Sequence, residues 1–141
     1  MTDRDLMSLA REASLNAYTP YSHFSVGAAI ECSDGSVYTG CNIENASYPA
    51  TVCAERTAVF KAVSEGHRSI SRIAVAAAPK GESAPFGEAA APCGVCRQVL
   101  SEFMNPEGVI LLARSETDYD VCTLGELLPR SFTAKDLETA E

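Results

Sequence analysis

The segment "ISRIAVAAA" at residues 70–78 constrains the fold most, because from residue 73 onward every position in it is apolar. Neighbouring side chains of a β-strand point to opposite faces of the sheet, so an unbroken apolar run is typical of a strand buried on both faces. Such a strand needs a covering layer on each side of its sheet. The pattern therefore predicts a central strand of an α/β protein, with helices packed on both faces.

Helix and strand patterns alternate along the rest of the chain. The first residues predict an amphipathic helix, whose apolar face is formed by Leu6, Leu9, Ala10, Ala13 and Ala17. Two segments of alternating residues flank Asp34-Gly35, which predicts a β-hairpin. The later segments predict a helix at 53–67, a helix at 92–104, a strand at 108–114, a short strand and helix at 119–129, and a weakly helical tail. We expect residues 1–141 to form one domain, a three-layer α/β/α fold whose mixed five-stranded sheet opens with the hairpin.

Charge and hydropathy narrow the range of partners. The net charge is −8 and the 11 Lys and Arg residues are scattered, whereas a nucleic-acid-binding protein needs a basic groove. The longest apolar runs are too short to span a membrane, and the first residues lack the pattern of a secretory signal. We therefore expect a cytoplasmic protein with a small-molecule substrate and with neither a nucleic acid nor a membrane as partner.

Cys93 and Cys96 form a C-x-x-C motif at the predicted start of a helix, after Pro92. Two thiolates three residues apart around a first helical turn can face one metal ion. The helix start also lowers the pKa of a thiol through its free N–H groups. A redox-active dithiol and two packed cysteines are the alternatives, and the spacing alone does not exclude them.

Cys53 also precedes a helical pattern, in "VCAERTAVF". If Cys53, Cys93 and Cys96 bind one zinc ion, the fourth position stays open for water, which is typical of a catalytic site. Glu55 lies two residues after Cys53 and can approach this open position as a proton shuttle. The alternative for Glu55 is an exposed residue that the helix dipole favours.

The other cysteines lie in apolar strand patterns and are expected to be small core residues; they are Cys32, Cys41 and Cys122. Neither His23 nor His67 is predicted to bind a metal.

The segments "CAE" and "PCGVCRQ" resemble the zinc-dependent cytidine deaminases, specifically the small-subunit, homotetrameric type that uses three cysteines. Four further segments, "PYSHFSVGAAI", "GCNIENASY", "CAERTAVFKAVSEG" and "ELLPRSF", look like blocks of this family in the same order, so the resemblance covers roughly residues 5–137. It implies the cytidine-deaminase-like version of the fold. It also implies hydrolysis of cytidine and deoxycytidine to uridine and deoxyuridine plus ammonia, a reaction of pyrimidine salvage at the C–N bond of a cyclic amidine.

The resemblance also implies roles for individual residues. Cys53, Cys93 and Cys96 would bind Zn²⁺, Glu55 would be the catalytic acid and base, and Arg56 would offset the charge of the thiolates. The residues implied in substrate binding are Phe24 for the base, Asn42 and Glu44 for the ribose, Ala54 and Ala91 through their backbones, and Tyr48 and Phe132 at sites shared between subunits. The last two imply a homotetramer whose active sites are completed across subunits.

Two features depart from the family pattern. The loop from Pro79 to Ala91 is longer than usual, and Ala91 stands where Ser or Thr is common. Three alternatives stay open at this stage: a deaminase of blasticidin S or another modified pyrimidine nucleoside, a non-catalytic structural zinc domain, and a deaminase that edits nucleic acids. The expected ribose-binding segment counts against the modified nucleoside. Glu55 counts against the structural zinc domain, and the negative charge counts against the nucleic-acid editor.

Overall fold

The computed structural model describes residues 1–79, 89–115 and 117–138. The loop expected to be long, from Pro79 to Ala91, lies outside the described residues between positions 80 and 88. The helices are α1 (Asp3–Ser14), the 3₁₀-helix η1 (Tyr48–Ala50), α2 (Ala54–Ser64), α3 (Gly94–Phe103), α4 (Leu124–Leu127) and α5 (Ala134–Glu138). The strands are β1 (Phe24–Cys32), β2 (Val37–Cys41), β3 (Ile70–Pro79), β4 (Met104–Ala113) and β5 (Tyr119–Thr123).

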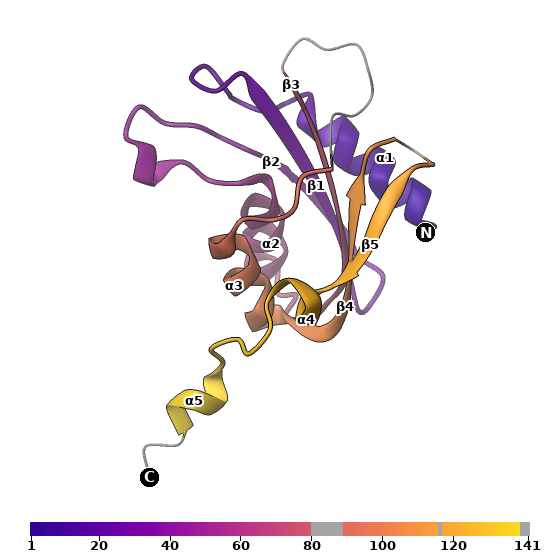
Figure 1. Ribbon diagram of the computed structural model, residues 1–141, viewed down its shortest axis with the longest axis vertical. Coiled ribbons are helices and arrows are strands. Elements are labelled where there is room, and N and C mark those ends of the chain that lie inside the picture. Colours follow the sequence, from indigo (N-terminus) through magenta and orange to yellow (C-terminus); the bar gives the residue numbers. More distant parts are fainter. Residues whose placement is uncertain (80–88, 116, 139–141) are drawn as a thin grey trace.

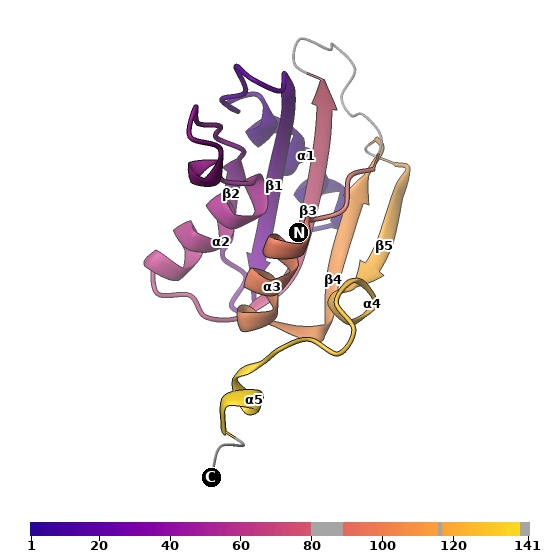
Figure 2. The same ribbon diagram turned by 60° about the vertical axis from the view of Figure 1, so that its left-hand side comes forward.

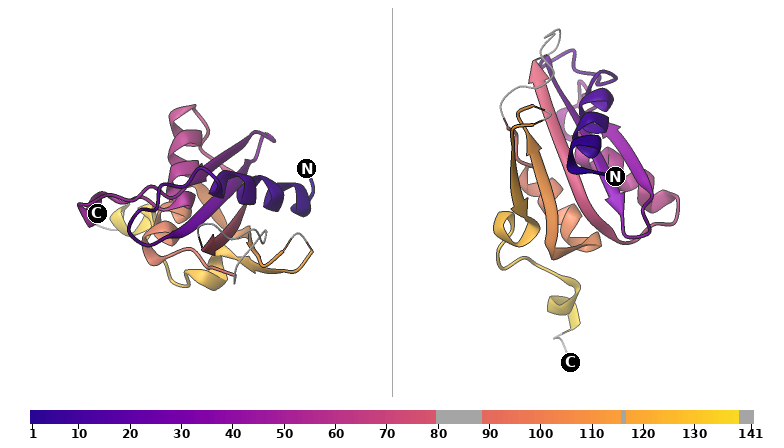
Figure 3. Two further views of the ribbon diagram at one scale, coloured as in Figure 1. Left: turned by 90° about the horizontal axis from the view of Figure 1, so that it is seen from above. Right: turned by 90° about the vertical axis from the view of Figure 1, so that its right-hand side faces the viewer.

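The five strands form one mixed sheet in the order β2-β1-β3-β4-β5, as expected. β3 and β4 run parallel, and the other neighbouring pairs run antiparallel. Helix α1 covers one face of the sheet, and α2 and α3 cover the other (Figures 1 and 3). The three-layer prediction is therefore confirmed. Within the described residues, each helix is too short or too polar to cross a membrane.

The predicted hairpin closes at Gly35, whose φ of 92° is a conformation that favours glycine. Its N–H donates to the carbonyl of Cys32, the last residue of β1. The apolar run in β3 is buried on both faces: Ile73 and Val75 pack toward α2 and α3, and Ala74 and Ala76 pack toward α1. The unbroken apolar run is thus explained by two hydrophobic clusters, one on each face of the sheet, to which alternate residues of β3 contribute.

Helix α1 is shorter than its apolar pattern predicted, because it ends at Ser14 before Ala17. After it, the chain turns, and the N–H of Tyr18 donates to the carbonyl of Asn42 beside the sheet. Met7 is fully buried with Leu6 and Ala10, although the pattern had not placed it on the apolar face. A helix lying on a flat sheet buries a wider stripe than the spacing of three and four residues indicates.

Two glycines let helices approach the sheet closely. A Cβ atom added at Gly27 would lie 1.8 Å from the carbonyl oxygen of Ala10 in α1. One added at Gly40 would lie 2.5 Å from the backbone nitrogen of Ala58 in α2. Both distances are far below van der Waals contact, so only glycine fits there. Gly40 thereby fixes the distance between α2 and β2, and with it the position of the start of α2.

Candidate metal centre and active site

The starts of α2 and α3 lie next to each other on the same face of the sheet (Figure 2). Cys53 is the N-cap of α2 and Cys93 is the N-cap of α3, both with extended backbone angles, and Cys96 lies in the first turn of α3. The first N–H groups of a helix have no partner within it and carry partial positive charge. Two such ends directed at one point favour negative charge there, which is the charge that thiolates carry.

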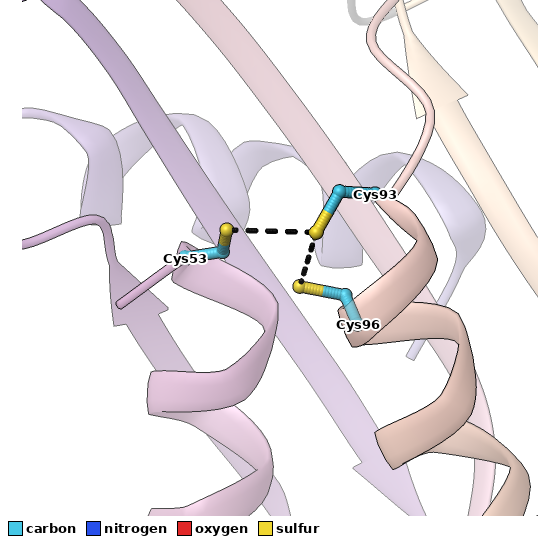
Figure 4. Close-up of side chains that lie close together, drawn as sticks. All are labelled: Cys53, Cys93 and Cys96. Atoms are coloured by element: carbon cyan, nitrogen blue, oxygen red, sulfur yellow. Dashed lines mark hydrogen bonds between the residues drawn. The ribbon is translucent and has the colours of Figure 1, made fainter. Parts of the chain in front are cut away.

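The three cysteine sulfurs form a compact triangle (Figure 4). The Sγ atoms of Cys53 and Cys93 are 3.8 Å apart, and those of Cys93 and Cys96 are 3.5 Å apart. A tetrahedral zinc ion with Zn–S bonds of about 2.3 Å separates its sulfurs by about 3.8 Å. All three cysteines are free of disulfides, and their sulfurs lie within 4.8 Å of one another. The donor set and its spacing therefore fit zinc, and a redox disulfide is not formed.

The thiols differ in how readily they ionise. Hydrogen bonds from Cys96, Arg56 and Cys93 lower the pKa of Cys53 to about 5, although burial opposes this. The pKa of Cys96 is raised, first by its hydrogen bond to the Cys53 thiolate and then by its own burial. The surroundings therefore favour the thiolate form on Cys53 rather than on Cys96, and metal binding would displace the proton of Cys96.

Arg56 lies in the first turn of α2 and donates from Nη2 to the Sγ of Cys53 over 3.3 Å. This is the contact that charge compensation requires, because three thiolates on Zn²⁺ carry a net charge of −1. Arg97, the arginine that follows Cys96, donates instead to the carbonyl oxygens of Pro92 and Leu127. It connects the start of α3 to α4.

Glu55 is buried, with 5% of its surface exposed, so it is not the solvated residue that the alternative interpretation required. Burial raises its pKa, and the nearby Cys53 thiolate adds to the shift. A hydrogen bond with Cys96 acts in the opposite direction. A carboxyl group with a raised pKa beside a metal centre is suited to proton transfer near neutral pH.

A cavity of about 200 Å³ opens onto these groups. Glu55, Cys53 and Cys93 line it. Four other residues predicted from the sequence line it as well: Phe24, Asn42, Ala54 and Ala91. The structure thus brings these predicted site residues together around a single hollow.

A second hollow, of about 390 Å³, adjoins the first at Thr51, which lines both. Glu44 and Tyr48 line it. Glu44 accepts hydrogen bonds from the N–H groups of Tyr21 and Ser22 at 3.0 Å and from the Ser22 hydroxyl, and these bonds lower its pKa. Glu44 is therefore held in place as a carboxylate.

Asn42 follows β2 directly, and its side chain binds the backbone of β1. Its Oδ1 accepts from the N–H of Val26 and its Nδ2 donates to the carbonyl of Phe24, both over 2.9 Å. Asn42 therefore fixes the end of the strand that carries Phe24.

Tyr48 and Phe132 are exposed at 73% and 59%. Tyr48 contacts Tyr21 edge to face, with ring centroids 6.3 Å apart. Phe132 precedes α5, which extends away from the rest of the chain (Figures 1 and 2), and it lines neither hollow described above. Within one chain, Phe132 is not part of the site.

Several residues that line the first cavity were not predicted from the sequence, among them Thr51, Val52, Val26 and Val75. Thr51 and Val52 directly precede Cys53, so their position in the chain was a usable signal. Val26 and Val75 are apolar strand residues, and their pattern does not distinguish a cavity wall from the core. Of the other cysteines, Cys32 is buried as predicted, whereas Cys41 and Cys122 are half-buried.

Fold and site together define a three-layer α/β/α protein with a three-cysteine zinc centre and a buried acidic residue beside it. Residues 1–112 match the family described as "Cytidine and deoxycytidylate deaminase zinc-binding region". The chain belongs to this family. Deaminases of this kind are hydrolases that act on C–N bonds, and zinc is their cofactor.

Individual relatives agree with this assignment. The chain is 45% identical over 135 residues to a cytidine deaminase of Sporosarcina psychrophila, covering 96% of this chain and 94% of the relative. It is 48% identical over 132 residues to a cytidine deaminase of Halalkalibacterium halodurans, covering 94% and 95%. Among solved structures, the cytidine deaminase of Burkholderia pseudomallei matches with a TM-score of 0.82 and 42% identity, covering 94% of this chain and all of that one.

Proposed function

We propose that this protein catalyses the zinc-dependent hydrolytic deamination of cytidine and deoxycytidine to uridine and deoxyuridine, with release of ammonia. The observation that carries the proposal is the sulfur triangle of Cys53, Cys93 and Cys96 with the buried Glu55 beside it at the end of a cavity. The named activity of the relatives supports it. We further propose that the enzyme acts in pyrimidine salvage in the cytoplasm.

The three cysteines would hold the zinc ion, which leaves one coordination position for water. A zinc ion held there would lower the pKa of a water molecule, so that the water could act as a nucleophile at neutral pH. Arg56 withdraws charge from the Cys53 sulfur through its hydrogen bond. Because a less negative ligand set leaves the metal a stronger Lewis acid, Arg56 supports turnover without touching substrate.

Glu55 would carry the protons of the reaction. Its carboxylate accepts a proton from the attacking water and delivers it to N3 of the cytosine ring as the C4–O bond forms. Glu55 then accepts the proton of the new C4 hydroxyl group and passes it to the amino group. The C4–N bond breaks, the C4 oxygen becomes the carbonyl of the product, and ammonia leaves. The burial of Glu55 supports this role, because a raised pKa suits a group that must both accept and release a proton.

The two adjoining hollows suggest how a nucleoside lies in the site. The base would occupy the cavity with Glu55, stacking on Phe24 and bonding to the backbones of Ala54 and Ala91. The ribose would extend past Thr51 toward Asn42 and Glu44. The fixed carboxylate of Glu44 can accept hydrogen bonds from sugar hydroxyls and repels a sugar phosphate, which favours a nucleoside over a nucleotide.

The decisive experiment compares wild type with Glu55→Gln at equal zinc content, following the ultraviolet absorbance of cytidine. Loss of the general acid and base lowers turnover by about 10²- to 10⁴-fold. Wild-type turnover of cytidine together with a nearly inactive variant supports both the reaction and the role of Glu55. If zinc-loaded wild type leaves cytidine unchanged but deaminates a modified nucleoside such as blasticidin S, the substrate assignment fails while the chemistry stands. No deamination of either would favour a structural zinc domain.

We also propose a homotetramer in which Tyr48 and Phe132 complete the sites of neighbouring subunits. Their high exposure and the projection of α5 from the body support this. Sedimentation measures the oligomeric state directly. Mixing two variants tests the sharing of sites: Phe132→Ala and Glu55→Gln, each weakly active alone, regain activity when their subunits are exchanged. Absence of regain in verified mixed tetramers would place Phe132 outside the active site.

A further inference from the structure

A second group of metal-binding side chains lies at the other end of the molecule from the three-cysteine centre. It consists of Cys32, Asp34 and His67, whose Sγ, carboxylate oxygen and imidazole nitrogen lie within 4.8 Å of one another. Cys32 ends β1 and Asp34 lies in the turn before β2, whereas His67 follows α2. The hairpin turn and the loop after α2 lie at the same end of the sheet (Figure 2).

This group is separate from the proposed active site. Cys53 precedes the first residue of α2 and His67 follows its last turn, so the 11 residues of the helix separate the two groups. At 1.5 Å per residue, the helix alone spans about 16 Å. Phe24 and Cys32 likewise stand at opposite ends of the nine-residue strand β1. A metal ion bound at one group therefore does not contact the ligands of the other.

The chemistry of the three donors matches zinc and similar divalent transition metals. Thiolate, imidazole and carboxylate are the three side-chain types that bind Zn²⁺ in proteins. Nδ1 of His67 lies 3.3 Å from Oδ2 of Asp34. This is long for a charge-assisted hydrogen bond, which is typically about 2.7–2.9 Å. It equals the separation, about 3.3 Å, of nitrogen and oxygen ligands on one tetrahedral zinc ion with bonds of about 2.0–2.1 Å.

Neighbouring groups hold the acidic side chain ready for a cation. Oδ1 of Asp34 accepts from the N–H of Ser36 at 3.0 Å, which leaves Oδ2 directed at His67. Ser33 connects the turn to the other loop: its N–H donates to the carbonyl of Ser69, and the two hydroxyl groups are 2.6 Å apart. The turn and the loop are thus already fastened together beside the three donors.

The imidazole is oriented as well. The ring of Tyr38 packs against that of His67, with centroids 5.2 Å apart. This packing restricts the rotation of the imidazole. The one arginine of the loop, Arg68, directs its guanidinium to the carbonyls of Val63 and His67. A hollow of about 200 Å³ adjoins the cluster, which is enough room for a metal ion and water.

We propose that Cys32, Asp34 and His67 form a second site for a divalent transition metal, with zinc as the expected ion. Bound there, the metal joins the β1–β2 turn to the loop between α2 and β3. It supplements the serine pair as a link between these segments and takes no part in deamination. The proposal does not depend on the proposed function. His67 was not predicted to be a ligand, and its contact with Asp34 is what makes it one in this proposal.

Cobalt titration tests the proposal. Co²⁺ alone is added to purified protein whose three-cysteine centre is filled with zinc, and thiolate-to-cobalt charge-transfer absorption is recorded. We expect one further equivalent to bind, with the weak band of a single thiolate. Cys32→Ser abolishes the band, and Cys122→Ser, which changes a half-buried cysteine outside the cluster, leaves it intact. Zinc displaces the cobalt, and the zinc content of the wild type then rises from one to two ions per chain.

Two milder variants guard against the possibility that Cys32→Ser, a buried change, does not fold. Asp34→Asn and His67→Gln keep the shape of the exposed turn and loop, and each weakens binding of the second equivalent about tenfold or more. Binding that is unchanged in both variants, or the absence of a second equivalent in wild type, overturns the proposal and leaves only the direct contact between His67 and Asp34. Cytidine turnover is measured in parallel and stays at the wild-type level in all variants. A wild type that binds the second ion but does not deaminate cytidine therefore counts against the proposed function alone.

Discussion

Gly40→Ala tests whether the close approach of α2 to the sheet fixes the geometry of the active site. The added Cβ would lie 2.5 Å from the nitrogen of Ala58, 2.8 Å from the carbonyl oxygen of Ala54 and 2.9 Å from the Cβ of Thr57. The two closest of these are backbone atoms of the helix, so no side-chain rotation relieves the contact. Ordinary contact begins near 3.4 Å. The helix must therefore retreat by roughly 0.9 Å, the difference between 3.4 and 2.5 Å.

This displacement affects folding and catalysis differently. Overpacking of this kind costs about 1–3 kcal/mol of unfolding free energy. The same shift moves Glu55 and Cys53, which begin α2, relative to Cys93 on α3. A displacement of about 1 Å in a catalytic group can lower the rate by about 10²-fold. We therefore expect kcat/KM to fall by more than the loss of stability explains, in protein that is still folded at the assay temperature.

The measurements are urea unfolding, zinc content and steady-state deamination of cytidine. Gly94→Ala is the matched control, because a Cβ at this first position of α3 meets no atom within 4 Å. It adds the same methyl group to the other helix of the site without a clash. If the unfolding free energy of Gly40→Ala lies within about 0.5 kcal/mol of the wild-type value and its kcat/KM is unchanged, close packing at Gly40 does not position α2.

Three further predictions follow from single contacts. Arg56→Ala removes the hydrogen bond to Cys53. At equal zinc content it should lower turnover roughly tenfold with little change in the free energy of unfolding. Full turnover of this variant would exclude charge compensation by Arg56. The hydrogen bonds from Arg72 lower the pKa of Glu31 below its ordinary value of 4.5. The contribution of this pair to stability is therefore fully present above pH 4.5. It is lost as the pH falls through the lowered pKa. The difference in unfolding free energy between wild type and Glu31→Gln should therefore shrink in acid, and a difference independent of pH would contradict this. Removal of zinc by a chelator should end turnover and added Zn²⁺ should restore it; activity that survives verified metal loss would rule out a zinc-dependent reaction.

The sequence predicted the element order and the mixed sheet because the strong signals are local. Asp34-Gly35 between two alternating segments specifies a hairpin, and the apolar run ending in Ala78 specifies a doubly covered strand. The end of α1 was predicted less well. Residues up to Ala17 keep the apolar pattern, but the backbone of Tyr18 bonds to Asn42, which lies far along the chain. A contact between distant segments of this kind leaves no trace in a local pattern.

The candidate metal centre was predictable for a similar reason. Cys53 and Cys93 each begin a helix, and the N-cap position can be inferred from the residues around it. The second metal-binding group was not predictable, because its residues come from the end of β1, the turn after it and the loop after α2. The proximity of these segments depends on the length of α2 and on the pairing of β1 with β3. Only the assembled sheet brings a buried strand cysteine next to a histidine 35 positions later.

The bonding of Asn42 and Glu44 bears on how the proposed site recognises its substrate. The side-chain oxygen and the side-chain nitrogen of Asn42 both form hydrogen bonds with the backbone of β1. Glu44 accepts three hydrogen bonds from Tyr21 and Ser22. Neither side chain has to be ordered when a ribose arrives, so binding does not include that entropic cost. The carboxylate is also kept ionised, because hydrogen bonds to its charged form lower its pKa. On the proposed assignment, a rigid group that is negative at neutral pH would face the sugar, and discrimination against phosphorylated sugars would not require any conformational change.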